Sequence, residues 1–284
     1  MVFYICMTKW SYLKKGGFMS RRVVVTGMGS INPLANDVET TWKKLLAGES
    51  GIGTIKSFST EDIRCQIGGE LKDFDILKFH IEQKVANKMD YCQQVSFAAM
   101  FEAGLQAKIP MRHPEEHNIV FPEFEGMKPA VNDPFRMGVM LGVGVGGIKT
   151  FQEQAEILFS KGARRVSPFL IPKMIANLAG GWIAQGINAM GVNSCYVTAC
   201  ASGTNALGEA FLAIKNNRAD IIVSGGFETA ACRIGYSGFS NMHAMSTRND
   251  DPTKASRPFD KDRDGFVMGE GGALVTDDPE LIKI

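Results

Sequence analysis

The alternation of short apolar runs with helical stretches is the feature that most constrains the fold of this chain. Five runs of β-branched and other apolar residues are typical of buried strands, at 23–26, 137–141, 195–199, 221–224 and 266–276. Between the first four lie stretches in which apolar residues recur with helical spacing, at 38–46, 95–105, 150–159 and 207–214. Strands that alternate with helices predict an α/β layered domain with a largely parallel sheet.

Two long segments do not fit this alternation. Residues 225–265 form a stretch of about forty residues rich in Gly, Ser, Asn, Asp and Pro, and such long irregular segments are usually functional. Residues 110–134 contain five prolines, which predicts a surface excursion. Within it, we expect His113 and His117 to be surface residues.

Composition limits the classes of function. The 31 Lys and Arg residues nearly balance the 30 Asp and Glu residues, so the formal net charge is +1. No strong field therefore favours nucleic acid or a membrane surface as the main partner. Hydrophobic residues make up 45% of the chain, which is typical of a globular protein and excludes extended disorder. No apolar run approaches the roughly 18 residues that a membrane span requires.

Cysteine usage points to a reducing compartment. The six cysteines are scattered, without a C-x-x-C pair, so we expect a cytoplasmic protein. Residues 1–18 lack the order of charges and the cleavage site of a secretory signal. We therefore expect residues 1–18 to be a disordered extension and residues 19–284 to form one domain.

Two motifs resemble ligand sites, but a structural role fits each better. The glycines at 142–147 satisfy the G-x-G-x-x-G pattern of a dinucleotide site. They do not open the fold, and no strand with an acidic end follows at the expected distance, so we expect them to let a strand and a helix pack closely. Residues 260–265 match the first half of a calcium loop, but Gly271 stands where the loop needs Glu. There we expect a turn with internal ion pairs and no metal.

The strongest candidate for chemistry is Cys200, which follows the apolar run 195–199 directly and precedes tiny residues and a helical pattern. A strand, a nucleophile and a helix in succession form the geometry of a nucleophile elbow. Free amides and the dipole at a helix N-terminus stabilise a thiolate, and small neighbours leave room for a substrate. A buried, unreactive cysteine at a tight turn fits the spacing equally well, so these residues alone leave both interpretations open.

Several further motifs occur in the order in which one family has them. They are Arg22-Val-Val-Val-Thr-Gly-Met-Gly, Ser167-Pro-Phe-Leu-Ile-Pro172, Thr198-Ala-Cys200-Ala-Ser-Gly203, Ala244-Met-Ser-Thr-Arg-Asn-Asp-Asp-Pro252 and Ala255-Ser-Arg-Pro-Phe-Asp-Lys-Asp-Arg-Asp-Gly-Phe-Val-Met-Gly-Glu-Gly271. On these motifs the chain resembles a β-ketoacyl-acyl carrier protein synthase of the elongating, type II kind, within the thiolase-like superfamily. The resemblance runs from about residue 21 to about residue 273. It implies the N-terminal half of a thiolase-like α/β fold: a five-stranded mixed, mostly parallel sheet with helices on both faces.

The resemblance implies an acyltransferase of fatty acid synthesis that uses no cofactor and forms homodimers. Cys200 would accept an acyl group from a carrier protein thioester, and a decarboxylated malonyl group on a carrier protein would then attack it. Lys84 and Lys88, four residues apart and so able to share a helix face, resemble basic positions that meet the acidic acyl carrier protein. His243 stands where relatives usually have an arginine in the same patch, so this contact is expected to be weaker or pH-dependent.

The resemblance also implies groups whose motifs this sequence does not contain. Family members carry two catalytic histidines, a lysine and a second oxyanion-hole amide in a C-terminal half of similar fold, and none of these motifs occurs before Ile284. We therefore expect a C-terminally truncated synthase that is slow or inactive alone and exposes an apolar face. Three alternatives remain open: a polyketide-type ketosynthase, a non-catalytic partner subunit of a full-length synthase, and a nucleotide-binding enzyme that uses the glycines at 142–147.

Overall fold

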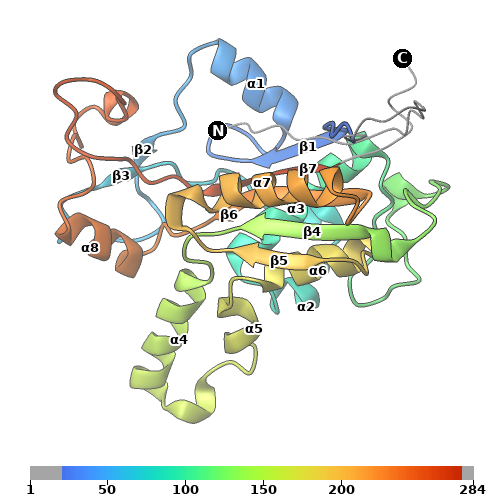
Figure 1. Cartoon of the computed structure of the whole chain (residues 1–284). Coiled ribbons are helices and arrows are strands. Elements are labelled where there is room, and N and C mark those ends of the chain that lie inside the picture. Colours follow the sequence, from blue (N-terminus) through green and yellow to red (C-terminus); the bar gives the residue numbers. More distant parts are fainter. Residues whose placement is uncertain (1–20, 277–284) are drawn as a thin grey trace.

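A five-stranded sheet runs through the centre of the computed structural model, which describes residues 21–276 (Figure 1). Its strands, in spatial order, are β1 (Gly27–Ile31), β7 (Gly271–Thr276), β6 (Ile221–Glu228), β4 (Met137–Gly142) and β5 (Asn193–Tyr196). β4 pairs in parallel with β5 and β6, whereas β7 pairs antiparallel with β6 and β1. Four strands therefore share one direction and β7 opposes them, which confirms the predicted mixed, mostly parallel sheet.

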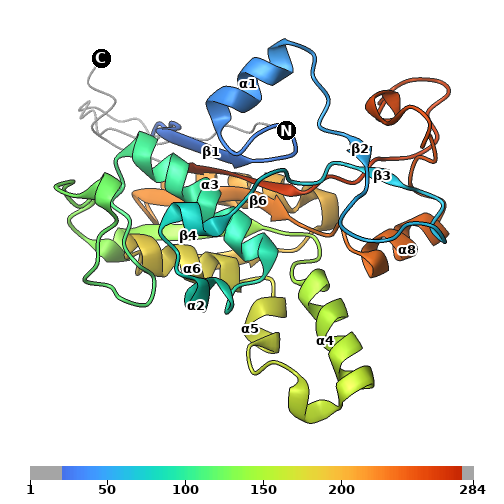
Figure 2. The same ribbon diagram turned by 180° about the vertical axis from the view of Figure 1, so that it is seen from behind.

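Helices cover both faces of this sheet. α3 (Tyr91–Ala107) packs against β1 and β7, and α6 (Leu178–Ile187) packs beside it against β4 and β5. α7 (Ser202–Lys215) packs against β6 and β4 on the opposite face. α7 lies in front of the sheet in Figure 1, and α3 lies in front of it in the reverse view of Figure 2. The predicted layers are confirmed.

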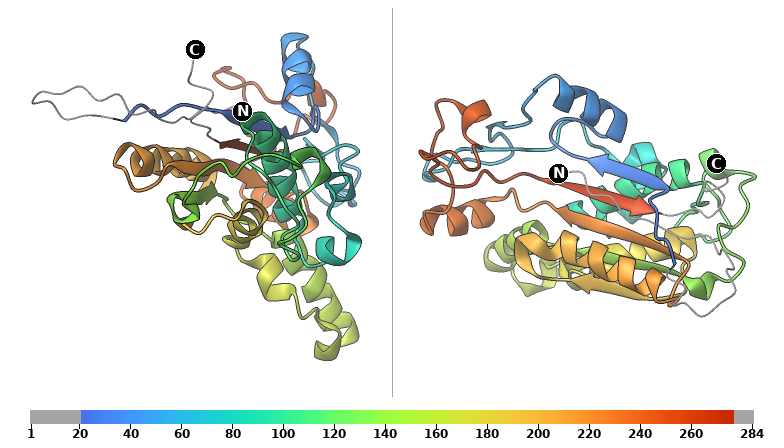
Figure 3. Two further views of the ribbon diagram at one scale, coloured as in Figure 1. Left: turned by 90° about the vertical axis from the view of Figure 1, so that its right-hand side faces the viewer. Right: turned by 45° about the horizontal axis from the view of Figure 1, so that its top comes forward.

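The remaining elements surround these layers, and α4 with α5 projects away from the sheet (Figure 3). In residues 21–276 they are α1 (Val38–Leu46), β2 (Gly53–Thr54), β3 (Ile67–Gly68), α2 (Gln83–Ala86), α4 (Ile148–Lys161), α5 (Leu170–Met174), α8 (Arg233–Asn241) and the short 3-10 helices η1 (Ile76–Phe79), η2 (Pro122–Phe124), η3 (Pro134–Arg136), η4 (Ala163–Arg165), η5 (Ala199–Ala201) and η6 (Pro252–Lys254). No helix of this part of the chain is long and apolar enough to cross a bilayer. The expected extension at 1–18 lies outside the described residues.

α3 is the central helix of the core, and its sequence explains where it starts. The Asp90 carboxylate accepts a hydrogen bond from the Cys92 amide, and the Gln93 side chain accepts one from the Asp90 amide, which together form a capping box. Apolar and small side chains occur all around the helix, so it is buried on most sides. The Phe101 ring packs edge-to-face on the Phe124 ring, with the ring centroids 5.1 Å apart.

Residues 110–134 belong partly to this core. Met111, Phe121 and Phe124 are at most 2% exposed and join the cluster around α3. The predicted surface excursion is therefore wrong for this part of the chain, because its prolines alternate with large apolar side chains that pack on α3. His113 is only 4% exposed and was wrongly expected at the surface.

The predicted helices lie where helices are observed, whereas the predicted strands are displaced at their ends. The first strand begins at Gly27, just after the predicted run 23–26, and Gly27 pairs with Thr276, the last described residue. β5 ends at Tyr196 rather than at residue 199, since the backbone leaves the extended region at Thr198 (ψ 43°) and Ala199 has a left-handed φ of 52°. β7 likewise starts later than predicted.

Candidate active site

Cys200 lies in η5, a 3-10 helix of one turn between the end of β5 and the start of α7. Its neighbour Ala199 has a φ of 52°, in the left-handed region that L-residues rarely adopt, so the chain turns sharply here. The Ser202 hydroxyl holds the turn, because it donates to the Ala199 carbonyl at 2.6 Å and accepts from the Thr198 amide at 2.9 Å. The expected succession of strand, cysteine and helix is present, and Cys200 faces solvent.

Cys200 is the exposed thiol of the described residues. Cys65, Cys92 and Cys232 are buried, and Cys195 is half-buried. Burial raises the pKa of each of these four thiols, most of all that of Cys92. A thiol reagent or acyl donor from solution therefore meets Cys200 first.

Glu228, at the end of β6, supports the glycine-rich loop beside this turn. Its carboxylate accepts hydrogen bonds from three successive loop amides, those of Gly144 (2.9 Å), Val145 (2.7 Å) and Gly146 (3.2 Å). Burial raises the pKa of Glu228, while these amides act in the opposite direction. The sequence analysis did not identify Glu228, although its position as an acidic residue at the end of a buried strand could have indicated it.

The glycines of the same loop allow close packing, as the sequence predicts. A Cβ placed on Gly142 would lie 2.1 Å from the carbonyl carbon of Ser202 and 2.4 Å from the amide nitrogen of Gly203. A Cβ on Gly203 would lie 3.2 Å from the Cα of Gly226. α7 therefore rests directly on β4 and β6, and this contact sets the position of the turn that carries Cys200.

The two lysines expected to meet a carrier protein are already paired within the chain. Lys84 lies on α2, which ends at Ala86, so Lys88 falls in the turn that follows and the two do not share one helix as expected. Lys88 is 2.6 Å from Glu115, and Lys84 is 3.4 Å from Glu116. Tighter turns follow the short α2 before α3 begins. Both lysines nevertheless pair with two neighbouring glutamates, Glu115 and Glu116.

His243 lies in another part of the molecule. It follows α8 with a left-handed φ of 55°, and its ring contacts the guanidinium group of Arg64. α2 and α8 lie well apart in Figures 1 and 2. The structure therefore does not bring His243 together with the two lysines, but it does place an arginine beside His243.

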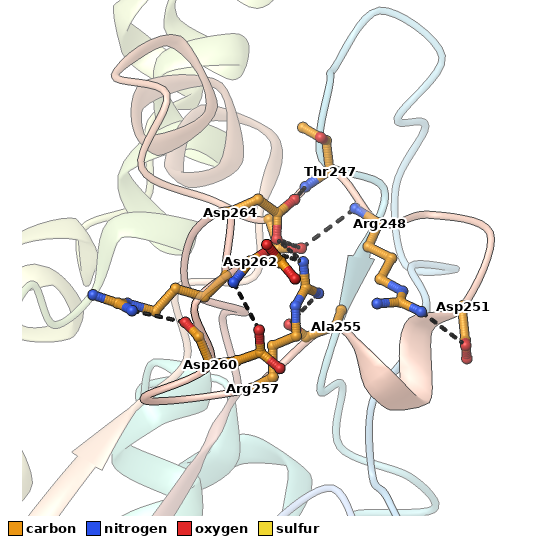
Figure 4. A network of polar contacts seen from close by, with 10 residues as sticks. Thr247, Arg248, Asp251, Ala255, Arg257, Asp260, Asp262 and Asp264 are labelled. Carbon is orange, nitrogen blue, oxygen red and sulfur yellow. Dashed lines mark hydrogen bonds and ion pairs between the residues drawn. The ribbon is translucent and has the colours of Figure 1, made fainter.

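Residues 260–265 form a turn in which Lys261 lies 3.8 Å from the Asp262 carboxylate, an internal ion pair of the kind that the sequence predicts. Arg257 lies 3.2 Å from the Asp264 carboxylate, and the Asp260 carboxylate accepts from the Asp262 amide at 2.7 Å (Figure 4). These contacts use the oxygens that a calcium ion would need. Across residues 21–276, no group of three or more His, Cys, Asp or Glu side chains is placed to hold a metal ion.

A cavity of about 720 Å³ is lined by residues from the β2–β3 hairpin and from the first turns of α3 and α4, and Cys200 does not line it. Its walls include Tyr91, Lys149 and Glu270. Burial raises the pKa of Glu270 to about 7, although the Leu71 amide and Lys149 act in the opposite direction. The cavity is separate from the turn that carries Cys200.

The sequence matches the family model described as "Beta-ketoacyl synthase, N-terminal domain" over residues 20–277. The chain belongs to the β-ketoacyl synthase family. It is 43% identical over 255 residues to 3-oxoacyl-[acyl-carrier-protein] synthase 2 of Synechocystis sp., an alignment that covers 90% of this chain and 57% of the relative. It is 41% identical over 256 residues to the synthase of the same name from Staphylococcus aureus strain COL, again with 90% and 57% coverage.

Solved β-ketoacyl synthase structures share this fold. A β-ketoacyl synthase from Burkholderia phymatum superposes with a TM-score of 0.76 at 24% identity, over 93% of this chain and 60% of that chain. The ishigamide ketosynthase/chain length factor gives a TM-score of 0.72 at 26% identity, with 93% and 60% coverage. A type II PKS acyl-carrier protein in complex with its ketosynthase gives 0.74 at 24% identity, with 92% and 59% coverage. The expected family and fold are confirmed, and the chain spans less than two thirds of the length of these relatives.

Proposed function

We propose that this protein is a 3-oxoacyl-[acyl-carrier-protein] synthase of fatty acid elongation and that Cys200 is its nucleophile. The observation that carries the proposal is the place of Cys200, an exposed thiol on a sharp turn between β5 and α7. In the first step, the Cys200 thiolate attacks the carbonyl carbon of an acyl thioester on a carrier protein. The bond from that carbon to the carrier sulfur breaks, and the carrier sulfur leaves and takes a proton, so the acyl group stays on Cys200.

In the second step, a malonyl group on another carrier protein loses CO2. The electron pair of the broken carbon–carbon bond attacks the acyl-enzyme carbonyl, and the Cys200 thiolate is expelled. The product is a β-ketoacyl group, two carbons longer, on the second carrier. Both steps place negative charge on a thioester oxygen, so each depends on hydrogen-bond donors that stabilise this charge.

The relatives favour fatty acid over polyketide substrates. The chain is 43% identical to 3-oxoacyl-[acyl-carrier-protein] synthase 2 of Synechocystis sp. but 26% identical to the ishigamide ketosynthase/chain length factor. The turn at Cys200 favours an enzyme over a non-catalytic partner subunit, because a scaffold gains nothing from an exposed thiol on a left-handed turn. Close packing of the glycines at 142–147 gives them a role without a nucleotide.

We expect the 284-residue chain to acylate Cys200 much faster than it completes condensation. Losing one donor that stabilises a developing oxyanion costs about 10²–10³-fold in rate. In residues 21–276, the histidine rings that make hydrogen bonds are those of His80, His113 and His243, and these bonds go to residues other than Cys200. Near-normal condensation with acyl and malonyl carrier proteins would contradict this expectation.

Mass spectrometry of the intact chain tests the nucleophile. After incubation with acyl carrier protein that carries a fatty acyl group, the chain should gain the mass of one acyl group, located on the Cys200 peptide. Cys200→Ala should gain none, and Cys195→Ala, which removes a half-buried thiol nearby in sequence, should behave as wild type. If wild type stays unmodified, or if Cys200→Ala is acylated as fast, the proposal fails.

We also propose that the chain self-associates, as a homodimer or larger. β5 is an edge strand of the described sheet, and its outer side has no partner strand. Apolar side chains near the site are exposed, with Val197 at 56% and Leu212 at 45%. Sedimentation velocity should show a species larger than the monomer, and a monodisperse monomer with a cooperative melt would count against this.

A further inference from the structure

A short acidic segment pairs with Lys84 and Lys88, the two lysines that the family resemblance assigns to carrier docking. The Lys88 Nζ lies 2.6 and 2.7 Å from the two carboxylate oxygens of Glu115. The Lys84 Nζ lies 3.4 Å from Glu116 and 3.0 Å from Glu82. Both lysines are therefore paired with carboxylates before any partner arrives.

A third polar contact lies between the same two segments. The His80 Nε2 is 2.8 Å from Glu123 Oε1, and this hydrogen bond lowers the pKa of Glu123. All three contacts join residues 80–88 to residues 115–123. The two segments therefore meet through two ion pairs and one hydrogen bond rather than through one isolated pair.

The buried core positions this acidic segment. His113, which is 4% exposed, accepts hydrogen bonds at Nδ1 from the amides of Glu115 (3.3 Å) and Glu116 (2.9 Å). Phe121, which is 2% exposed, stacks on the His80 ring with 5.7 Å between the ring centroids. The backbone that carries the two glutamates is therefore fixed, while their carboxylates stay at the surface.

We infer that Glu115 and Glu116 are an internal competitor for the acidic carrier protein, which docks on Lys84 and Lys88 by displacing them. This inference rests on the proposed function, because it takes the carrier protein as the partner. The side chains of Lys84 and Lys88 are 60% and 30% exposed, and ion pairs at such sites are weak enough to exchange. Each exchange replaces one ion pair by another, so the internal glutamates reduce the affinity of the face for any acidic partner.

The test compares Glu115→Gln with Glu125→Gln. Both variants remove one negative charge from the same segment, but Glu125 is exposed and has no ion pair among the contacts of residues 21–276. With acyl carrier protein as the probe, Glu115→Gln should lower the Kd about two- to fivefold, the range expected when one ion-pair competitor is removed. Glu125→Gln should change it by less than about twofold, and added salt should shrink the difference.

A double variant separates competition at Lys88 from a general change of charge. If Glu115 acts by occupying Lys88, Glu115→Gln should have no effect on the Kd in a Lys88→Met background. Glu116→Gln repeats the test at Lys84 should Glu115→Gln fail to fold. Equal tightening by Glu115→Gln and Glu125→Gln, tightening that persists with Lys88→Met, or no tightening would each overturn the inference.

Acylation of Cys200 by the same carrier protein shows whether a negative binding result overturns the internal competitor alone or the proposed function as well. If wild type is acylated but Glu115→Gln binds the carrier no more tightly, only the internal competitor is overturned. If no variant binds the carrier or becomes acylated, the proposed function falls, and the inference falls with it.

Discussion

Replacing Gly142 with alanine tests whether the contact between β4 and α7 sets the position of Cys200. The added Cβ would lie 2.1 Å from the carbonyl carbon and 2.2 Å from the carbonyl oxygen of Ser202, whereas ordinary contact begins at 3.4 Å. Backbone atoms meet here, so no side chain can rotate to make room. α7 must therefore move away from β4 by about 1 Å, because a packed interior has no free space to absorb the methyl group.

The expected effects follow from this displacement. Overpacking of a core costs about 1–3 kcal/mol, and each kcal/mol lowers the Tm of a domain of this size by about 2–4 °C, so the Tm should fall by about 2–12 °C. The turn that carries Cys200 moves with α7, and a misplacement of about 1 Å can cost about 10²-fold in rate. Acylation of Cys200 should therefore slow even at temperatures at which the variant is fully folded.

Gly208→Ala is the matched control, because Gly208 lies on the exposed side of the same helix and an added Cβ there meets nothing within 4 Å. Alanine is favoured over glycine inside a helix by about 1 kcal/mol, so the control should melt slightly higher and acylate Cys200 normally. Thermal melts and timed mass spectrometry of the Cys200 peptide measure both quantities. A Gly142→Ala variant that melts and acylates like wild type would refute the reasoning.

Two further predictions concern stability. Between pH 4.5 and 7 the folded state holds a proton on Glu270 that the unfolded state has released, since the folded pKa is about 7 against an ordinary value of 4.5. Wild type should therefore lose up to about 3 kcal/mol as the pH rises through this window. Glu270→Gln should lose less in urea unfolding at pH 5 and pH 8, and equal losses would contradict the assignment. Phe124→Ala should lower the free energy of unfolding by about 3–5 kcal/mol, because the ring is fully buried against Phe101. Phe135→Ala, at a ring that is 68% exposed, should cost far less, and similar losses would argue against this core.

Local patterns in the sequence were sufficient to predict which helices and strands form and where the candidate nucleophile Cys200 lies between them. The helical spacing at 38–46 predicts a helix, and α1 has these bounds. Cys200 follows β5 and precedes α7 as the run of apolar and then tiny residues indicates. These features depend on hydrophobic periodicity and turn chemistry within about twenty residues, which the sequence displays directly.

Contacts between distant segments were decided by the tertiary structure. Glu228 accepts the amide of Gly144, 84 residues away, and Lys88 pairs with Glu115, 27 residues away. No period in the sequence relates these partners, because a carboxylate binds whichever donor the packed elements bring to it. The order of motifs along the chain determined the family, whereas the fold decided which charges are free to meet a partner. That division follows from the range of the interactions: backbone preference and burial act locally, while ion pairs and hydrogen bonds between side chains form only once the surfaces are assembled.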